Sequence, residues 1–385
     1  MKQVLKIVGM VVVLCGAVQA NAQQIGKYVP IPAGSDADKA LTEINAASDP
    51  AQKLALIDKF AGEAQGDIAI VADDQYVNYY LGQKNYDKVF EYGDRLFALD
   101  PDNFANGVNL TRAAAEKGDT EKLFTYGEKT QGIWDRYKAA PAPEGKDASN
   151  WDQQKKQVLD SNKDNYEYVQ QLMLNAANRT TDPAKKAVLF QRFGQAFPDS
   201  VYGKQAMAMA AAGYRQAQNT PKMLEVSNAV LAKDPDNLGV LLLLSDYYSE
   251  KGEQLDKAET YAKKAAELTD SEKKPEGVDE AAWGQQKSLQ KGLALSSLGQ
   301  VSIQKKDNAK AVESFRAAAP LLKADEVSYG RNQYRLGFAL VNLKKNAEAK
   351  EAFTQAASVN SPYKALAQQK LQELAKAGAR KSSGN

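Results

Sequence analysis

The sequence contains no histidine, the residue that most often serves as general base and as metal ligand. This absence excludes Ser-His-Asp and Cys-His catalysis and any zinc site built on histidine. The chain also lacks a glycine-rich phosphate loop. Carboxylate-only chemistry, as in glycosidases, stays open. We therefore expect no cofactor and no metal ion, and no enzyme of the histidine-dependent classes.

The N-terminal segment 1–22 has the three-part layout of a secretory signal peptide. Lys2 and Lys6 precede an apolar run from Ile7 to Val18, which leads to the small-x-small triplet Ala20-Asn21-Ala22. This layout predicts cleavage after Ala22 and a periplasmic or secreted mature chain. Because the run has only about 12 residues, it is too short to cross a bilayer comfortably. An uncleaved N-terminal anchor is the alternative.

Cleavage after Ala22 changes both the thiol content and the charge of the chain. It removes Cys15, the only cysteine, so the mature chain has neither disulfides nor thiol chemistry. It also removes Lys2 and Lys6, which leaves 48 basic and 48 acidic residues. A chain without a basic surplus lacks the electrostatic footprint of nucleic-acid binding, so no nucleic-acid partner is expected. The mature chain has no other apolar run long enough to span a membrane.

Three sequence landmarks recur in the same order and at nearly the same offset. Residues 49–53 return at 182–186, residues 100–103 return at 234–237, and the Pro-Glu-Gly to Trp segment at 143–155 returns at 275–287. We interpret this as a copy of about 133 residues that occurs twice and begins again near Leu289. The predicted segments are the signal peptide at 1–22, a disordered leader at 23–35, a first copy at 36–164, a second copy at 165–288, a partial third copy with a capping helix at 289–377, and a disordered tail at 378–385.

A shorter period lies within the copies. The chain is rich in the helix formers Ala, Lys, Gln, Glu and Leu. Tyr92-Gly93 recurs as Tyr126-Gly127, an interval of about 34 residues. Two stretches pair a Leu-Gly with later small and large residues, at Leu298-Gly299, Ala311, Phe315 and Ala318, and at Leu336-Gly337, Ala349, Phe353 and Ala356. In this pattern the chain resembles the tetratricopeptide-repeat family, in which glycine lets two helices approach closely and an aromatic ring fills the space beside it.

The resemblance implies an all-α fold, a right-handed superhelical solenoid of antiparallel helix pairs. We predict eight helical hairpins, at 36–63, 68–101, 104–137, 165–197, 201–235, 237–270, 289–322 and 327–357. A last helix opens at Ser361-Pro362 and runs to about Lys376, where its leucines would cover the exposed apolar end of the stack.

The two Trp segments have a structural and a functional interpretation. Structurally, Pro and Gly end one helix, Asp caps the next, and the tryptophan packs between hairpins; this is the favoured interpretation. Functionally, Trp151 and Trp283 would anchor a partner on a projecting loop. The interval from Trp151 to Asp182 exceeds the interval from Trp283 to Asp307 by seven positions. Because this difference is close to two helical turns, a long helix is expected after each tryptophan, two turns longer in the first copy.

The two Asp-Pro-Asp-Asn runs at 100–103 and 234–237 offer calcium ligands by composition. A calcium loop needs further oxygen ligands and a glutamate at a fixed distance, and neither run has them. We interpret both runs as a helix stop followed by an N-cap.

In the tetratricopeptide family the first helix of each hairpin lines a concave groove that binds peptides or proteins. The resemblance maps that groove to Asp74, Asn78, Arg112, Arg215, Gln300, Arg331, Tyr334 and Phe338. Some members clamp a terminal carboxylate with Lys and Asn; here Asp74 stands in the lysine place and Asn78 fits. Arg331, Tyr334 and Phe338 share one helical face and form the best cluster to test, although the two aromatics could instead pack on the capping helix.

The predicted function is a non-catalytic protein-binding scaffold of the exported bacterial envelope type. The turn Pro198-Asp199-Ser200-Val201-Tyr202 resembles a turn of envelope tetratricopeptide proteins. A carbohydrate-binding protein or carboxylate-dependent enzyme on an α-helical solenoid is the alternative, and self-association is a third possibility.

Overall fold

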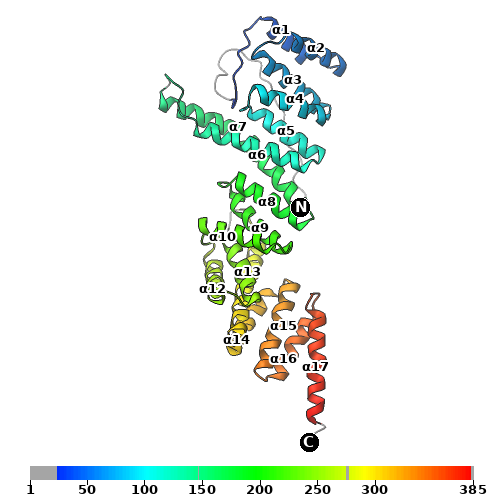
Figure 1. The fold of residues 1–385 in the computed structure, drawn as a ribbon, viewed down its shortest axis with the longest axis vertical. Helices are drawn as coiled ribbons and strands as arrows, with labels where there is room; N and C mark the ends of the chain where they lie inside the picture. The colour runs from blue at the N-terminus through cyan, green and yellow to red at the C-terminus, as the bar shows by residue number, and fades with distance from the viewer. Residues whose placement is uncertain (1–23, 146, 275–276, 383–385) are drawn as a thin grey trace. The chain divides into compact units, whose positions relative to one another are not determined.

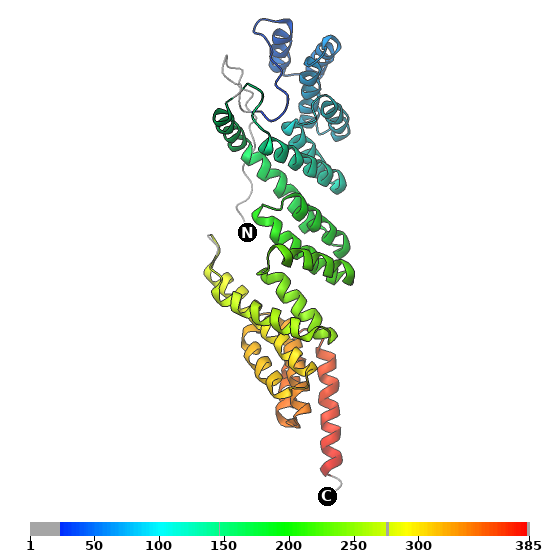
Figure 2. The same cartoon turned by 60° about the vertical axis from the view of Figure 1, so that its left-hand side comes forward.

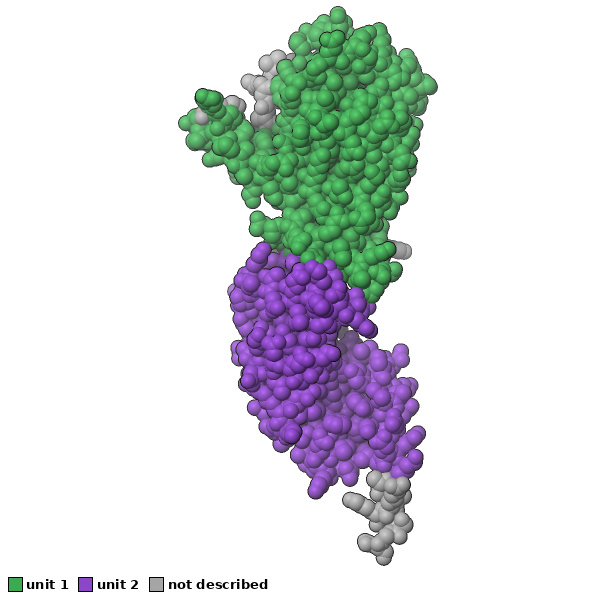
Figure 3. Space-filling view, viewed as in Figure 1, with its two compact units in different colours: residues 1–203 green, residues 204–385 purple. Residues whose placement is uncertain are grey.

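The computed structural model describes residues 24–145, 147–274 and 277–382. Across these ranges it contains 17 helices and no strand, which confirms the all-helical prediction (Figure 1). The chain forms two compact units, Met1–Gly203 and Lys204–Asn385, coloured separately in Figure 3. The predicted signal peptide at 1–22 lies outside the described residues.

Unit 1 is a stack of four helix pairs, coloured from blue to green in Figure 2. Each helix contacts the next, and the first helices of neighbouring pairs also meet, α3 with α5 and α5 with α7. The helices are α1 (Asp36–Ala46), α2 (Pro50–Glu63), α3 (Ile68–Gly82), α4 (Tyr86–Leu99), α5 (Phe104–Lys117), α6 (Thr120–Ala139), α7 (Ala148–Arg179) and α8 (Pro183–Ala196).

Unit 2 repeats this arrangement and ends in a single helix. Here α11 contacts α13, α13 contacts α15, and α17 packs on α15 and α16. The helices are α9 (Val201–Gln216), which begins in the last residues of unit 1, α10 (Thr220–Lys233), α11 (Leu238–Lys251), α12 (Leu255–Ser271), α13 (Glu280–Gln304), α14 (Asn308–Leu322), α15 (Glu326–Asn342), α16 (Asn346–Ser358) and α17 (Lys364–Ser382). The eight predicted hairpins and the final helix are therefore present in the described part of the chain.

The helix ends explain the recurring acidic and amide residues. Asn103 Oδ1 accepts a hydrogen bond from the Asn106 backbone N–H at 3.0 Å, directly after α4 ends at Leu99. Asn237 caps α11 in the same way through the Val240 N–H at 3.2 Å. Side-chain acceptors of this kind satisfy the free N–H groups of a helix start. The stop-and-cap interpretation of both Asp-Pro-Asp-Asn runs is confirmed.

The Trp segments start the two longest helices. Asp147 and Asp279 are the N-caps of α7 and α13, and Gly145 and Gly277 precede them with φ of +79° and +78°. Helix α7 has 32 residues and α13 has 25, a difference of seven, so the predicted two-turn extension is confirmed. The borders predicted at 165 and 289 consequently fall inside these two helices.

The tryptophans themselves contribute to the fold. The Trp151 indole N–H donates to the Ala140 carbonyl oxygen at 3.1 Å, and its ring meets Tyr137 edge-on. Trp283 is buried, with 6% of its surface exposed. These contacts favour the structural interpretation of the two segments, and the role of Trp151 and Trp283 as anchors for a partner stays a prediction.

Glycines at the helix crossings set the distance between paired helices. A Cβ atom on Gly299 of α13 would lie 2.6 Å from the Phe315 ring of α14. The same distance separates a Cβ on Gly337 of α15 from the Phe353 ring of α16. Both phenylalanines are completely buried. The close approach expected of the two Leu-Gly pairs is confirmed, since no larger residue fits there without displacing a ring.

The leader is not the disordered segment that we expected. Ile25 is 2% exposed, and its carbonyl accepts the Phe104 N–H at 3.1 Å. The Lys27 N–H donates to Asp100 Oδ2 at 2.9 Å, and the Lys27 ammonium pairs with Asp67 at 2.6 Å. The leader thus packs on the turn between α4 and α5 and on the start of α3, because one apolar side chain and three polar contacts hold it there. At the other end, α17 continues to Ser382, beyond the predicted helix end.

Candidate functional site

The first helices of unit 1 carry a polar surface that the hydrophobic core does not use. On α3, Asn78 Nδ2 donates to Asp74 Oδ2 at 2.9 Å. Asn109 of α5 donates to Asn78 Oδ1 at 3.5 Å. Arg112 lies one turn further along α5. We call these four residues the Asp74 face. The predicted groove residues Asp74, Asn78 and Arg112 are therefore brought to neighbouring helices, joined by Asn109, which the sequence did not single out.

The charges of the Asp74 face are unevenly paired. Arg112 Nε donates to Glu116 Oε1 at 2.7 Å, and the Tyr86 hydroxyl donates to Glu116 Oε2 at 2.9 Å. Burial works against ionisation of Glu116, but these hydrogen bonds outweigh it and lower the pKa of its carboxyl. Asp74, in contrast, pairs with no lysine or arginine among the described residues. Burial raises the pKa of Asp74 to about 6, against a smaller opposing effect of the Asn78 hydrogen bond.

The neighbouring Asp73 shows what a paired carboxylate on α3 looks like. Its side chain is turned to α4, where Arg95 lies 2.9 Å away. Asp73 is 3% exposed and serves the packing of α3 on α4. Because consecutive helix positions point in different directions, Asp74 is left on the other side of α3 without such a partner in the described structure.

Unit 2 places an ion cluster on its first helices. Arg215 of α9 donates to Asp246 and to Glu250 of α11, both at 2.7 Å. Arg331 of α15 lies 3.0 Å from Asp246, and Arg335 of α15 lies 2.8 Å from Glu250. We call these five residues the ion cluster. Its ion pairs join α11 to α15, although α12, α13 and α14 lie between these two helices in the sequence.

The ion cluster is partly buried, with Arg335 innermost and Glu250 exposed, and it carries one excess positive charge. Burial works against ionisation of Asp246, but Arg331, Arg215 and Arg335 outweigh it and hold the pKa of its carboxyl below the ordinary value. Arg335 is 8% exposed, and its Nη1 has no hydrogen-bond partner in the described structure. Asp246 Oδ1, 3.8 Å from that Nη1, likewise has none. These side chains bind each other first, so a partner could use them only by breaking existing ion pairs.

The predicted set Arg331, Tyr334 and Phe338 does not form one surface. Arg331 belongs to the ion cluster, and Tyr334 packs its ring against Phe353 and Tyr363 at centroid distances of 5.7 and 5.6 Å. Phe338 is 42% exposed. Gln300 of α13 is half-buried. Tyr334 therefore packs at the end of the stack, as the alternative interpretation expected, whereas Phe338 leaves much of its ring exposed.

Sequence reasoning missed Asp246, Glu250 and Arg335. The signal that could have found two of them is the repeat offset, because Asp246 and Glu250 stand where the first copy has Arg112 and Glu116. No such signal exists for Arg335, because its partner Glu250 lies 85 residues away in the sequence.

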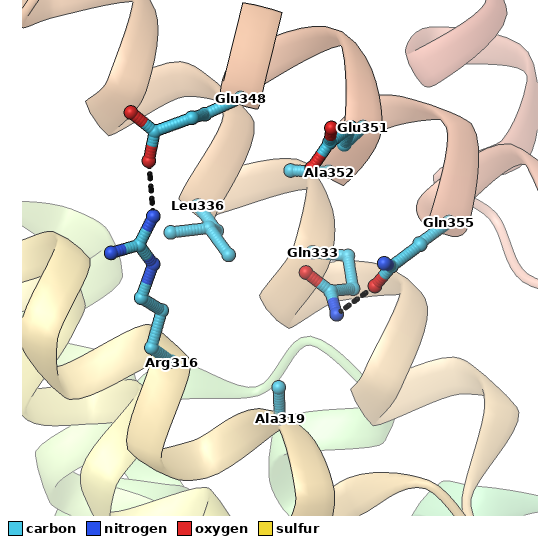
Figure 4. Close-up of a pocket in the computed structure, with 8 residues that line it drawn as sticks. All are labelled: Arg316, Ala319, Gln333, Leu336, Glu348, Glu351, Ala352 and Gln355. Atoms are coloured by element: carbon cyan, nitrogen blue, oxygen red, sulfur yellow. Dashed lines mark hydrogen bonds and ion pairs between the residues drawn. The ribbon is translucent and has the colours of Figure 1, made fainter. Parts of the chain in front are cut away.

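A small surface hollow of about 220 Å³ lies between α14, α15 and α16. Figure 4 shows Arg316 paired with Glu348 on one side and Gln333 Nε2 donating to Gln355 Oε1, at 2.6 Å, on the other. Within the described ranges no three metal-ligating side chains gather, and no helix is both long and apolar enough to cross a bilayer. The hollow holds paired side chains and offers no nucleophile beside a base.

Comparison with known proteins supports the repeat class. Residues 330–363 match the family model described as tetratricopeptide repeat, a range that covers most of α15, all of α16 and the turn before α17. No curated protein matches this chain. The fold is that of an α-helical repeat protein, and one of its hairpins matches the tetratricopeptide model directly.

Three solved structures illustrate how weakly this chain resembles known folds at the level of whole chains. NprR in complex with its cognate peptide NprX is 14% identical, with 88% of this chain and 82% of that chain covered at a TM-score of 0.32. Yeast Tom70 is 12% identical, with 89% and 95% covered at 0.32. The human IFIT1 dimer with m7Gppp-AAAA is 16% identical, with 87% and 71% covered at 0.38. At these identities and scores the likenesses do not define a ligand, and the expectation that nucleic acid does not bind stays a prediction.

Proposed function

We propose that the chain is an exported, non-catalytic scaffold of the bacterial envelope type that binds a protein or peptide partner on the first helices of its hairpins. The observation that carries this proposal is the Asp74 face. Its polar side chains stand on α3 and α5, are linked to one another by hydrogen bonds, and include a carboxylate that no cation of the described chain pairs with. A surface of this kind adds little to the stability of the fold, so binding is the role that it fits.

Three further observations support parts of this proposal. The signal-peptide pattern before Gln23 supports export. The tetratricopeptide match at 330–363 supports protein binding, because stacked hairpins of that class create long surfaces for partners. The carbohydrate-binding alternative depends on exposed tryptophans, and both Trp151 and Trp283 are engaged within the fold.

Site-specific photocrosslinking in intact cells tests the proposal. A photoreactive phenylalanine analogue replaces Ala105, which is exposed on α5 one turn before Asn109, and in a matched variant replaces Val188 of α8, which is also exposed. We expect a discrete crosslinked protein from position 105, identified by mass spectrometry, and none from position 188. The same crosslinks from both positions, or no crosslink from position 105, would contradict the proposal.

A further inference from the structure

We propose that the Asp74 face binds a cationic side chain of a peptide partner, a lysine ammonium or an arginine guanidinium, through the Asp74 carboxylate. This inference rests on the proposed function and names the chemistry of the partner. It concerns unit 1 alone, and the ion cluster of unit 2 takes no part in it.

The Asp74 carboxylate has one hydrogen-bond donor and room for another. Its Oδ2 accepts from Asn78 Nδ2 at 2.9 Å. No hydrogen bond to its Oδ1 is found among the described residues, and Asp74 as a whole is half-buried, so part of the residue faces solvent. A carboxylate accepts up to about four hydrogen bonds, which leaves capacity for an ammonium or a bidentate guanidinium.

The charged groups beside Asp74 are already paired. Arg112, the nearest cation along α5, donates to Glu116 at 2.7 Å. Arg95 is bound to Asp73 on the other side of α3. Arg112 with Glu116 therefore counts as a neutral pair, and Asp74 remains as an uncompensated negative charge on this face. Charge complementarity then favours a cationic group and disfavours an acidic peptide or a nucleic-acid backbone.

The two asparagines hold the carboxylate in place. Asn109 donates to Asn78 Oδ1, and Asn78 donates both to the Asp74 carboxylate and to its backbone carbonyl at 3.0 Å. This chain of hydrogen bonds fixes the rotamer of Asp74 before any partner arrives, which reduces the entropy lost on binding. A metal ion is a poorer candidate than an ammonium or guanidinium, because one carboxylate and amide oxygens do not complete the shell of a divalent cation.

A partly desolvated carboxylate without a cation disfavours the folded state, and a bound cation removes that disadvantage. The same reasoning predicts specificity. Glutamine in place of the cationic residue would leave the Asp74 charge unpaired, and glutamate would add repulsion.

A peptide array tests the inference with the full mature chain. Short peptides of varied sequence are printed in sets of four that differ only at the central position, which is Lys, Arg, Gln or Glu. We expect the native chain to bind Lys and Arg members about tenfold more strongly than their Gln and Glu counterparts. Asp74→Asn should reduce Lys and Arg binding to the Gln level. Asp36→Asn makes the same charge change at a side chain that is 99% exposed, and it should bind like the native chain.

A charge-reversal variant keeps the result interpretable. Asp74→Lys should move the preference from Lys and Arg members to Glu members, and circular dichroism of both variants verifies that the helices form. Binding without preference for a cation, or unchanged cation preference in Asp74→Asn, would overturn this inference while the scaffold proposal stands. If no peptide of any set binds and position 105 gives no crosslink in cells, both are overturned.

Discussion

Two aspartates on first helices show how the environment decides what one residue type can do. Asp74 is partly buried without a cation from the described chain, and its pKa rises to about 6. Asp246 is also partly buried, yet three arginines outweigh the burial and lower its pKa. The first carboxylate is therefore free to take a partner, whereas the second is committed to holding α9, α11 and α15.

Replacing Asp74 should stabilise the protein above pH 6. At about pH 3.5 and below the carboxyl is mostly protonated in both the folded and the unfolded chain, so it changes the free energy of unfolding very little. As the pH rises, the unfolded chain ionises first, and the raised pKa of the folded state makes ionised Asp74 unfavourable for folding. Asp74→Asn should gain about 1–3 kcal/mol at pH 8 and about nothing at pH 3.5. Urea midpoints at the two pH values measure this, and a loss of stability at pH 8 would show that the carboxylate has a structural role.

Replacing the two aromatic residues of α15 one at a time should change the stability of the protein by different amounts. Tyr334→Ala removes a ring packed between Phe353 and Tyr363, and it should cost about 1–3 kcal/mol. Phe338→Ala removes an exposed ring and should change stability by less than about 0.5 kcal/mol. Chemical denaturation of the two single variants gives both values. Equal losses would mean that Phe338 is also packed.

At the scale of elements, the helix pairs depend on close crossings. Gly299→Leu should cost about 1–3 kcal/mol, because even a Cβ atom at this site would lie 2.6 Å from Phe315. Gly337→Leu should have the same effect through Phe353, at the equivalent crossing of α15 and α16. Thermal or urea midpoints of the two variants measure the loss.

Helix α13 also contains a control position for the Gly299 substitution. Gly284 lies in the same helix as Gly299, but a Cβ there meets nothing within 4 Å. Gly284→Leu should leave stability unchanged or raise it slightly, because leucine has the higher helix propensity. A similar destabilisation at positions 284 and 299 would indicate a general effect of leucine, not overpacking at the crossing.

Most element boundaries followed from local signals. The caps Asp49, Asn103, Asp182 and Asn237 each accept a hydrogen bond from the N–H three positions on, and the sequence shows them as Asp or Asn before a helix-forming run. The border of the second copy was predicted less well. The repeat pattern suggested a hairpin from 165, whereas the long helix expected after Trp151 starts behind its Asp147 cap and continues through that position.

At the scale of the whole molecule, the exported form should begin at Gln23. The triplet Ala20-Asn21-Ala22 after the apolar run motivates this prediction. Intact-mass and N-terminal peptide analysis of the protein purified from the envelope checks it. Ala22→Leu replaces the small residue that the peptidase requires and should retain the signal peptide. An intact Met1 in the purified native protein would contradict cleavage and favour the anchor.

The repeat class of this protein was determined by its sequence, because helix periodicity, caps and crossing glycines act over a few residues and recur along the chain. Tertiary structure alone decided which distant side chains meet. Arg335 reaches Glu250 across 85 residues, and Lys27 reaches Asp100 across 73. Such contacts depend on how successive hairpins stack, and small rotations accumulate from pair to pair beyond what any local pattern encodes. For the same reason the sequence placed Asp74 in a groove, but only the packing of the described helices left its carboxylate without a cation.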